Sequence, residues 1–351
     1  MKKLNRVLLI GLAALTALSA ALVPAAMAQD AEIVNSYDNT AELIQKFPVN
    51  NPTPVEEGMG EKIQNRLLTG FENWNRGFDA WKAWGNILYT EDSIYNVHGA
   101  RLTLAEYQTA MDITLKQTNI LMGDFMNMII CDDWTAIQYE ISTQVGDMVI
   151  PGTVMEFVKF ADYGDELGVR VVEGWGGVKD ISYTGMSMFQ GEAEKEFQKT
   201  ADEALLAYEI PETDDLAEKY PVLNPTTDNS EIAAEIRAAI LAHFDSWNKG
   251  YEEWAAAVDN FYTEDAVINL GVGQDLSLDA YKAAVKEQME TKTVEKMYFD
   301  SMLISEDWGA IHFRIVATNP ETGEREPGDM MQFFHFVQDG NTVRVDKSWT
   351  E

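Results

Sequence analysis

The chain of 351 residues has little cysteine and little positive charge. Cys131 is its single cysteine, so no intrachain disulfide can form, and its place in an apolar run predicts an inert core residue. Only 26 Lys and Arg residues stand against 58 Asp and Glu residues, which gives a formal net charge of −32 at pH 7. A field of that sign repels nucleic-acid phosphates and anionic membrane surfaces. We therefore expect neither as a partner.

Signatures of metal and cofactor chemistry are also missing from the sequence. It has four histidines but no HExxH motif, cysteine pair or closely spaced histidine cluster, which are the usual sources of metal ligands. It has no glycine-rich phosphate loop and no serine nucleophile motif. We therefore expect no metal site and no bound cofactor.

One long apolar run is present, and it lies near the beginning of the chain. Residues 7–23 form this run, three basic residues precede it, and Ala26-Met27-Ala28 stands before Gln29. This order is typical of a secretory signal peptide with a small-residue cleavage site. A membrane anchor is the alternative, but the run is short for a bilayer span and no basic cluster follows it. The sequence predicts removal of residues 1–28 and an exported protein, secreted or periplasmic, without a membrane anchor.

An internal repeat organises the rest of the chain. The segment from Phe71 to His98 returns as Phe244 to Gly271, 173 residues later, with tryptophans, asparagines and a Tyr-Thr-Glu-Asp motif at matching positions. The match extends back to residues 41–53 and 214–226, which share an aromatic-Pro-Val and an Asn-Pro-Thr sequence. The Pro residues predict a rigid turn that leads into a helix in each copy.

The repeat predicts a simple domain organisation. We interpret residues 41–177 and 214–351 as two copies of one domain. Residues 29–40 are polar, and we expect a flexible segment there. Residues 178–213 join the copies, and the pattern at 192–209 predicts a helix in this linker.

Within each copy, helices come first and strands follow. In the first copy the apolar periodicity predicts helices at 60–75 and 78–88 and a third helix that begins near Thr103, with Glu106 completing a capping box. Alternating patterns then predict strands at 93–97, 125–131, 134–143, 153–160 and 169–175, and the last four are matched in the second copy by 298–304, 309–317, 330–337 and 343–349. Short acidic turns join these strands into hairpins. The order predicts an α+β fold, with helices packed on one face of a strongly bent antiparallel sheet in each domain.

Short motifs in each half resemble a known family. They are Tyr89-Thr90-Glu91-Asp92, its counterpart at 262–265, and the strand pair formed by 156–160 and 171–175. With the helix aromatics, they make each half similar to the nuclear transport factor 2-like superfamily, and within it to SnoaL-like polyketide cyclases and ketosteroid isomerases. The resemblance implies two tandem cone-shaped domains that pack through their sheets as an internal pseudo-dimer, in a chain that is a monomer.

The resemblance also points to candidate catalytic residues. Glu156 stands where these cyclases and isomerases place a carboxylic acid in the pocket, and a carboxyl in an apolar cavity can transfer protons near neutral pH. The base position of the isomerases falls on Val97 in this chain, so His98, beside it, is the alternative base. The second copy has Gln332 and Gly271 at the two positions. We therefore expect any proton-transfer site in the first copy.

Other residues are candidates for contact with a ligand. Their aromatic rings or polar groups lie on elements expected near the cavity, and core packing or turn formation is the alternative explanation; they are Trp74, Trp81, Tyr95, Asn96, Asn269, Gln332 and His335. The function expected is binding of an apolar small molecule in a hydrophobic pocket, with cofactor-independent isomerase, cyclase or dehydratase activity. A non-catalytic ligand- or partner-binding module is the alternative, and a purely structural repeat protein is a third interpretation.

Overall fold

The computed structural model describes residues 33–53, 55, 57–97, 99–177, 186–227, 230–270 and 275–351. The predicted signal peptide, His98 and Gly271 lie outside these residues. Among the described residues, no helix combines the length and the apolar character needed to span a bilayer.

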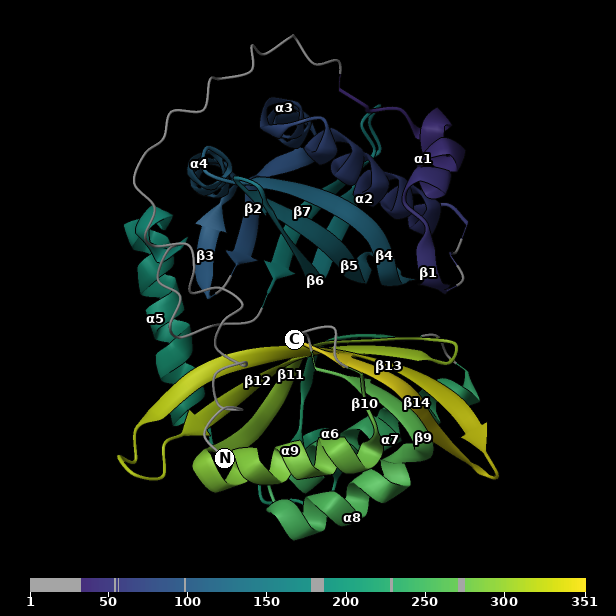
Figure 1. Ribbon diagram of the computed structural model, residues 1–351, viewed down its shortest axis with the longest axis vertical. Coiled ribbons are helices and arrows are strands. Elements are labelled where there is room, and N and C mark those ends of the chain that lie inside the picture. The colour runs from purple at the N-terminus through teal and green to yellow at the C-terminus, as the bar shows by residue number, and fades with distance from the viewer. Residues whose placement is uncertain are drawn as a thin grey trace. The chain divides into compact units, whose positions relative to one another are not determined.

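The first domain begins with helices and ends in a meander of long strands (Figure 1). Its elements are η2 (Tyr37–Asn39), α1 (Thr40–Lys46), β1 (Val49–Pro52), α2 (Met59–Asn75), α3 (Phe78–Leu88), β2 (Tyr89–Val97), β3 (Ala100–Thr103), α4 (Leu104–Leu115), β4 (Asn119–Cys131), β5 (Trp134–Val145), β6 (Met148–Asp162) and β7 (Val169–Gly176).

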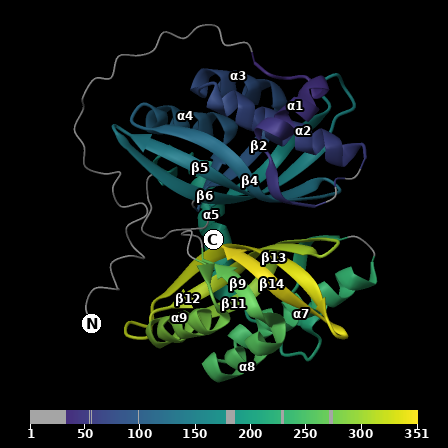
Figure 2. The ribbon, with the colours of Figure 1, turned by 45° about the vertical axis from the view of Figure 1, so that its right-hand side comes forward.

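These strands form one seven-stranded sheet in the order β1-β4-β5-β6-β7-β2-β3. The four central strands pair antiparallel, whereas β1 pairs parallel with β4 and β2 pairs parallel with β7. Helices α2, α3 and α4 lie over one face of the sheet (Figure 2). The apolar side chains of this face and of the helices form one core, which includes Ile63, Leu68 and Phe125.

The second domain repeats this topology. Its elements are α6 (Leu216–Lys219), β8 (Val222–Thr227), α7 (Glu231–Trp247), α8 (Tyr251–Phe261), β9 (Tyr262–Asn269), β10 (Asp275–Leu276), α9 (Leu278–Thr291), β11 (Thr293–Ser305), β12 (Trp308–Thr318), β13 (Arg325–Asp339) and β14 (Thr342–Thr350). Read from β8, its sheet order is β8-β11-β12-β13-β14-β9-β10, which matches the first sheet strand for strand. The predicted α+β class, with two domains of the same architecture, is confirmed.

Two asparagine side chains, one in each domain, show that the domains also match residue by residue. Asn75 binds the backbone of Met122 on β4, both as donor and as acceptor, with two hydrogen bonds of 2.8 Å. Asn248 binds the backbone of Lys296 on β11 in the same way, with hydrogen bonds of 2.9 and 2.8 Å. Met122 and Lys296 therefore occupy equivalent positions in the two domains.

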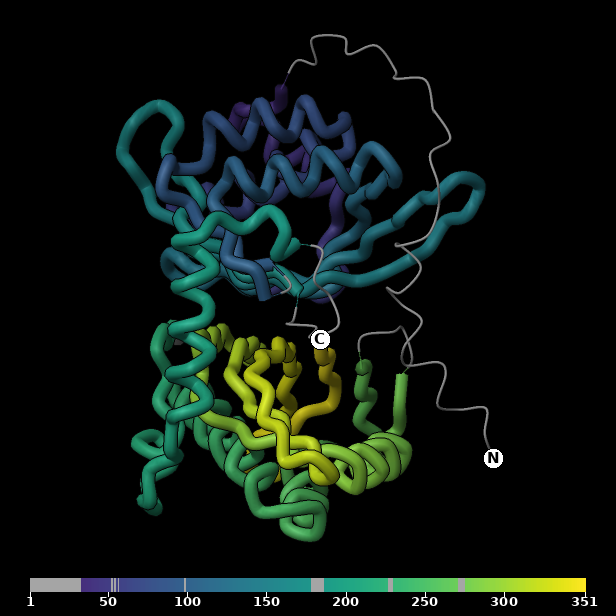
Figure 3. Tube along the Cα trace, turned by 90° about the vertical axis from the view of Figure 1, so that its left-hand side faces the viewer, coloured from purple at the N-terminus to yellow at the C-terminus, as the bar shows by residue number. Residues whose placement is uncertain are grey.

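The predicted helix starts and the helix between the domains are also present. Thr103 accepts a hydrogen bond from the Glu106 amide, and the Glu106 carboxylate accepts one from the Thr103 amide, as a capping box requires. Helix η3 (Met186–Phe189) and helix α5 (Glu192–Ala207) lie between the domains in sequence (Figure 3). Arg101 of the first domain lies over the ring of Phe197 in α5, and Arg325 of the second domain donates to the α5 carbonyl of Leu206.

Two predictions differ from the structure. The expected rigid turns at 47–53 and 220–226 contain the edge strands β1 and β8. Pro lacks a backbone N–H, and an edge strand tolerates this because only one of its sides pairs with a neighbouring strand. The described part of the expected flexible segment, 33–40, packs on the first domain, where the Asn73 side chain binds both backbone groups of Val34. Polar composition did not reveal this anchoring, since the partners lie far away in sequence.

Candidate functional site

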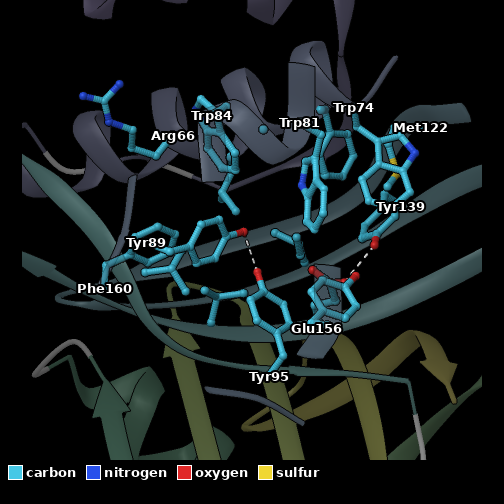
Figure 4. A pocket seen from close by; sticks show the side chains of 17 residues that line it. Arg66, Trp74, Trp81, Trp84, Tyr89, Tyr95, Met122, Tyr139, Glu156 and Phe160 are labelled. Carbon is cyan, nitrogen blue, oxygen red and sulfur yellow. Dashed lines mark hydrogen bonds between the residues drawn. The ribbon is translucent and has the colours of Figure 1, made fainter. Parts of the chain in front are cut away.

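The core of the first domain contains a cavity of about 70 Å³ between its helices and its sheet (Figure 4). Aromatic rings form most of its wall, and one carboxyl group reaches it from the sheet. The lining side chains that matter for its chemistry are Trp74, Trp81, Trp84, Tyr95, Tyr139 and Glu156. The site is therefore a chamber walled mainly by aromatic rings, with one acidic residue, Glu156, and one basic residue, Arg66, in its lining.

Strand register brings Glu156 to this chamber. On β6, Glu156 pairs with Ile137 of β5 on one side and with Gly176 of β7 on the other. A Cβ atom at Gly176 would lie 3.1 Å from Glu156 Oε1, so glycine leaves room for the carboxyl. The Tyr139 hydroxyl donates a hydrogen bond of 2.9 Å to the same oxygen.

The surroundings of Glu156 change its acidity. Burial raises the pKa of Glu156 to about 7, the hydrogen bond from Tyr139 opposes the rise, and the charge of Glu351 adds to it. A carboxyl group with a pKa near neutrality can both accept and return a proton under ordinary conditions. This makes Glu156 a chemically competent acid and base.

Phenol groups surround the carboxyl. The hydroxyls of Tyr89 and Tyr95 are 2.6 Å apart and hydrogen-bonded, and the ring of Tyr95 stacks on Tyr107 at 4.5 Å. Gly174 allows this packing, because a Cβ atom there would lie 3.2 Å from the Tyr95 ring. Burial raises the pKa of Tyr89, Tyr95 and Tyr107. These phenols therefore remain neutral and able to donate hydrogen bonds.

Tryptophans close the chamber on the helix side. The Trp74 indole donates a hydrogen bond of 2.7 Å to the carbonyl of Ile120, which holds the ring in place. Trp81 packs edge-on against Trp74 at 5.0 Å and against Tyr107 at 5.6 Å. The structure thus brings four of the candidate residues, Trp74, Trp81, Tyr95 and Glu156, to one cavity.

Three other candidates do not line this cavity. Asn96 binds Glu173 and the Gly174 carbonyl, because it follows Tyr95 on β2 and successive strand residues face opposite sides. Asn269 donates to Asp275 in the second domain. His335 lies between the carboxylates of Asp307 and Asp346, its nearest ring atoms 3.3 and 2.5 Å away.

The second domain replaces the polar groups of the chamber. Strand register places Gln332 at the position of Glu156, and Gln332 donates to Thr350 at 2.9 Å. Phe313 stands where Tyr139 stands in the first domain, and Ile268 where Tyr95 stands. The second core therefore has no counterpart of the carboxyl or of its phenol donor at these positions.

A buried lysine takes the place of a cavity residue in the second domain. Lys296, equivalent to Met122, is 3% exposed, and its ammonium group lies 4.6 Å from the ring centre of Trp247 and 4.2 Å from that of Phe313. Burial lowers the pKa of Lys296 to about 7. Burial and the charge of Lys296 together lower the pKa of the neighbouring His243 to about 3, so this imidazole is neutral.

Sequence reasoning missed the phenols around Glu156 and the buried lysine. Tyr139 lies on the strand next to Glu156, and only the strand register shows that the two side chains meet. Lys296 lies in a strand that reads as half-polar, so its position resembled a surface position. The part of the chain that the structure describes contains no group of three or more His, Cys, Asp or Glu residues able to hold a metal ion.

The SnoaL-like domain family matches residues 224–345, within the second domain. No curated protein matches the chain. Similar solved structures include a protein classed as a SnoaL-like polyketide cyclase from Jannaschia sp. CCS1, with 14% identity over 35% of this chain and 89% of the other, and a TM-score of 0.32.

Two further solved structures have similar sequence identities, coverages and TM-scores. A ketosteroid isomerase-like protein from Erwinia carotovora atroseptica SCRI1043 shares 19% identity over 34% of this chain and 95% of its own, with a TM-score of 0.29. IdmH from Streptomyces antibioticus shares 17% identity over 33% of this chain and 89% of its own, with a TM-score of 0.28. At this distance they carry neither a substrate nor a reaction across to this chain.

Proposed function

We propose that the first domain binds a small, largely apolar molecule in its aromatic chamber and that Glu156 exchanges a proton with it. The observation that carries the proposal is a single carboxyl group, with a pKa near neutrality, set among aromatic rings and held by Tyr139. The reaction class is cofactor-independent proton transfer, as in an isomerase, cyclase or dehydratase.

The chemistry follows from the groups around the chamber. The ionised carboxylate of Glu156 removes a proton from a carbon next to a carbonyl group, and the electron pair moves onto the carbonyl oxygen. Neutral phenols such as Tyr95 and Tyr107 donate hydrogen bonds to the oxygen that becomes negative. The protonated Glu156 then returns the proton to the same or another carbon, which restores the carboxylate.

Acetone provides a minimal test of this step. Its methyl protons exchange with solvent deuterium only if a base removes them, and proton NMR in D₂O measures the rate. We expect the wild-type protein to accelerate the exchange and Glu156→Gln to reduce it to the background rate. The matched control is Gln332→Ala in the second domain, which should exchange like wild type. Equal rates for wild type and Glu156→Gln would refute the catalytic role.

The size of the chamber favours a second candidate function. Pockets for drug-sized ligands have roughly 300–1,000 Å³, whereas this chamber has about 70 Å³. The base position of the isomerases is also apolar, since Val97 occupies it. A non-catalytic binding module for small apolar molecules fits both facts. Binding of acetone without any exchange of its methyl protons supports this alternative.

We also infer that the two domains arose by duplication and pair through their sheets as an internal pseudo-dimer. In support, one apolar cluster combines Phe157 and Trp134 of the first sheet with Leu303, Trp308 and Phe333 of the second. Such a pairing covers, within one chain, the sheet surface that two separate chains would otherwise bury by forming a dimer. Light scattering at micromolar concentration should give the mass of a monomer, and a stable dimer would contradict the inference.

A further inference from the structure

A carboxyl group of the second domain reaches the strand that carries Glu156. Glu351, which follows β14, accepts a hydrogen bond of 2.8 Å from the backbone N–H of Met155 and one of 2.7 Å from the hydroxyl of Thr153. Met155 directly precedes Glu156 on β6. The first domain therefore receives a second carboxyl group beside the one in its chamber, and this second group comes from the other copy.

The second domain fixes the backbone of Glu351. The N–H of Glu351 donates to the Met331 carbonyl at 2.9 Å, and its own carbonyl accepts from the Met331 N–H at 2.8 Å. These two bonds extend the pairing of β13 with β14 by one residue beyond Thr350. The Glu351 side chain therefore starts from a well-defined position.

The first domain lacks the matching pair of backbone bonds. Gly177 is the residue equivalent to Glu351 by strand register. Its N–H donates to the Met155 carbonyl at 3.2 Å, but the Met155 N–H is bonded to the Glu351 carboxyl group and not to Gly177. Glycine has no side chain with which to make the reverse contact. The contact therefore runs in one direction, from the second domain to the site of the first.

The surroundings of Glu351 let its charge act on nearby groups. Burial raises the pKa of Glu351, whereas the hydrogen bonds from Thr153 and Met155 oppose the rise. Among the described residues, no Lys, Arg or His forms an ion pair with this carboxyl group. Buried charges are screened less by water and salt than exposed charges are. A carboxylate in this position therefore influences other ionisable groups close to it.

Both partners in the hydrogen bond between Tyr139 and Glu156 respond to this charge. Burial is the main reason that the pKa of each is raised, and the negative charge of Glu351 adds to the rise in both. Arg66, the charged residue on the helix side of the lining, donates to two backbone carbonyls. The remaining groups are neutral phenols whose pKa values burial raises, those of Tyr89, Tyr95 and Tyr107. Of these groups, Glu351 is the one that brings a negative charge.

We propose that Glu351 is a positioning residue for the site of the first domain: it anchors the backbone of β6 beside Glu156 and places a negative charge near the chamber carboxyl. Successive residues of a strand face opposite sides, so the anchor holds Met155 while Glu156 points into the chamber. The second copy thus contributes to the site of the first, although its own core has Gln332 in place of the carboxyl group. The inference rests on the proposed function and on the proposed pairing of the two sheets.

Glu351→Gln separates the charge from the contacts. The amide oxygen can accept from the Met155 N–H and the amide nitrogen can donate to the Thr153 hydroxyl, but the charge is absent. Carbon-13 NMR of labelled glutamate side chains measures the titration of Glu156. Because loss of a like charge favours the carboxylate, we expect the Glu156 midpoint to move to lower pH, with a change of about twofold or more in the ionisation equilibrium. An unchanged midpoint would overturn the proposal.

Two further variants test whether the effect belongs to Glu351. Glu140→Gln is the matched control, since Glu140 lies opposite Thr153 on β5 but is exposed, where water screens its charge. It should leave the Glu156 midpoint unchanged, and a shift equal to that of Glu351→Gln would contradict a specific role. Glu351→Asp keeps the charge, so its midpoint should lie closer to that of the wild type.

The anchor has a separate measurement. Amide hydrogen exchange of Met155 reports whether its N–H stays bonded. Its protection should persist in Glu351→Gln and fall about tenfold in Glu351→Ala, which removes the acceptor. Equal protection in the wild type and both variants would show that Glu351 does not anchor β6. Circular dichroism and thermal unfolding show whether each variant is folded.

Failure of this inference differs from failure of the proposed function. In Glu351→Gln the pH dependence of acetone exchange should move with the Glu156 titration, in the same direction and by the same amount. If the wild type exchanges acetone but the titration does not move, the proton-transfer function stands and the role of Glu351 is wrong. If the titration moves but the wild type exchanges no acetone, the proton-transfer function is wrong and Glu351 acts on Glu156 in a binding module.

Discussion

Tyr139 and Glu156 lie diagonally across two neighbouring antiparallel strands, and the phenol donates a hydrogen bond of 2.9 Å to the carboxyl. Diagonal neighbours in a sheet are within reach of long side chains. The donor favours the carboxylate, whereas the apolar surroundings favour the neutral acid. The two effects oppose each other, and their balance leaves Glu156 able to change its charge near neutral pH.

Stability should depend on pH through Glu156. Its pKa is about 7 in the folded protein and 4.5 for an ordinary glutamate. Below pH 4.5 the group is protonated in both states and has no effect. Between pH 4.5 and 7 only the unfolded state ionises, so the folded state loses stability as the pH rises. Above pH 7 the loss is complete, at roughly 3 kcal/mol.

Glu156→Gln removes this group and should reveal the effect. We expect the variant to match the wild type in free energy of unfolding at pH 4 and to exceed it by roughly 3 kcal/mol at pH 8. Urea unfolding at a series of pH values measures the difference. Gln332→Glu, at the equivalent position of the second domain, is a useful comparison, because it introduces a carboxyl without a phenol donor. A difference that does not vary with pH would contradict the raised pKa.

Tyr139→Phe should raise the pKa of Glu156 further. The substitution removes the hydroxyl that stabilises the carboxylate and keeps the ring. Carbon-13 NMR of labelled glutamate side chains follows the titration directly. Tyr262→Phe serves as the control, since Tyr262 is a buried tyrosine of the second domain and its hydroxyl is close to Ser348, not to Glu156. An unchanged Glu156 titration in Tyr139→Phe would show that the hydrogen bond does not form in solution.

Lys296→Met should stabilise the protein, and more strongly at low pH. The pKa of Lys296 is about 7 in the folded protein and 10.5 for an ordinary lysine. Above pH 10.5 the amine is neutral in both states. As the pH falls from 10.5 to 7 only the unfolded state gains the proton, so the folded state loses stability, by at most about 5 kcal/mol below pH 7.

Methionine is the natural replacement because Met122 occupies the equivalent position. Thermal unfolding at pH 6 and at pH 10 should show a large gain in the first case and a small gain in the second. Lys286→Met, in which the replaced lysine lies on the exposed side of α9, should have little effect at either pH. A gain of equal size at both pH values would show that only apolar packing changed.

Export should leave a processed protein. The pattern of residues 1–28 predicts cleavage between Ala28 and Gln29, because small residues stand at the two recognition positions. Intact-mass measurement of the protein recovered outside the cytoplasm gives the cleavage site to one residue. Ala28→Arg should block processing, whereas Met27→Leu should not. A full-length mass in the exported fraction would contradict the prediction.

The sequence predicts the fold well because the repeat supplies two versions of each element. The helix at 78–88 is predicted without error, since apolar periodicity and flanking glycine agree. The start of α4 is also predicted, because Thr103 caps it. The edge strands β1 and β8 were not predicted, because they are short and contain Pro. Their partners, β4 and β11, lie more than 70 residues away in the sequence.

The site is only partly predictable for a related reason. Glu156, Trp74 and Tyr95 stand out by residue type and by their place in the repeat. The partners that define the chemistry of Glu156 do not, because Tyr139 meets it through register and Gly176 matters only by leaving space. Register depends on hydrogen bonds between distant segments, and no local pattern encodes it.

The indole of Trp74 has a second role beyond the chamber. β1 pairs with β4 only from Phe125 onward, so the preceding part of β4 has an edge without a neighbouring strand. Trp74 and Asn75 occupy backbone groups of Ile120 and Met122 on that edge. Open edges recruit strands of other molecules and start aggregation. We therefore expect substitution of Trp74 to lower solubility as well as to alter the chamber.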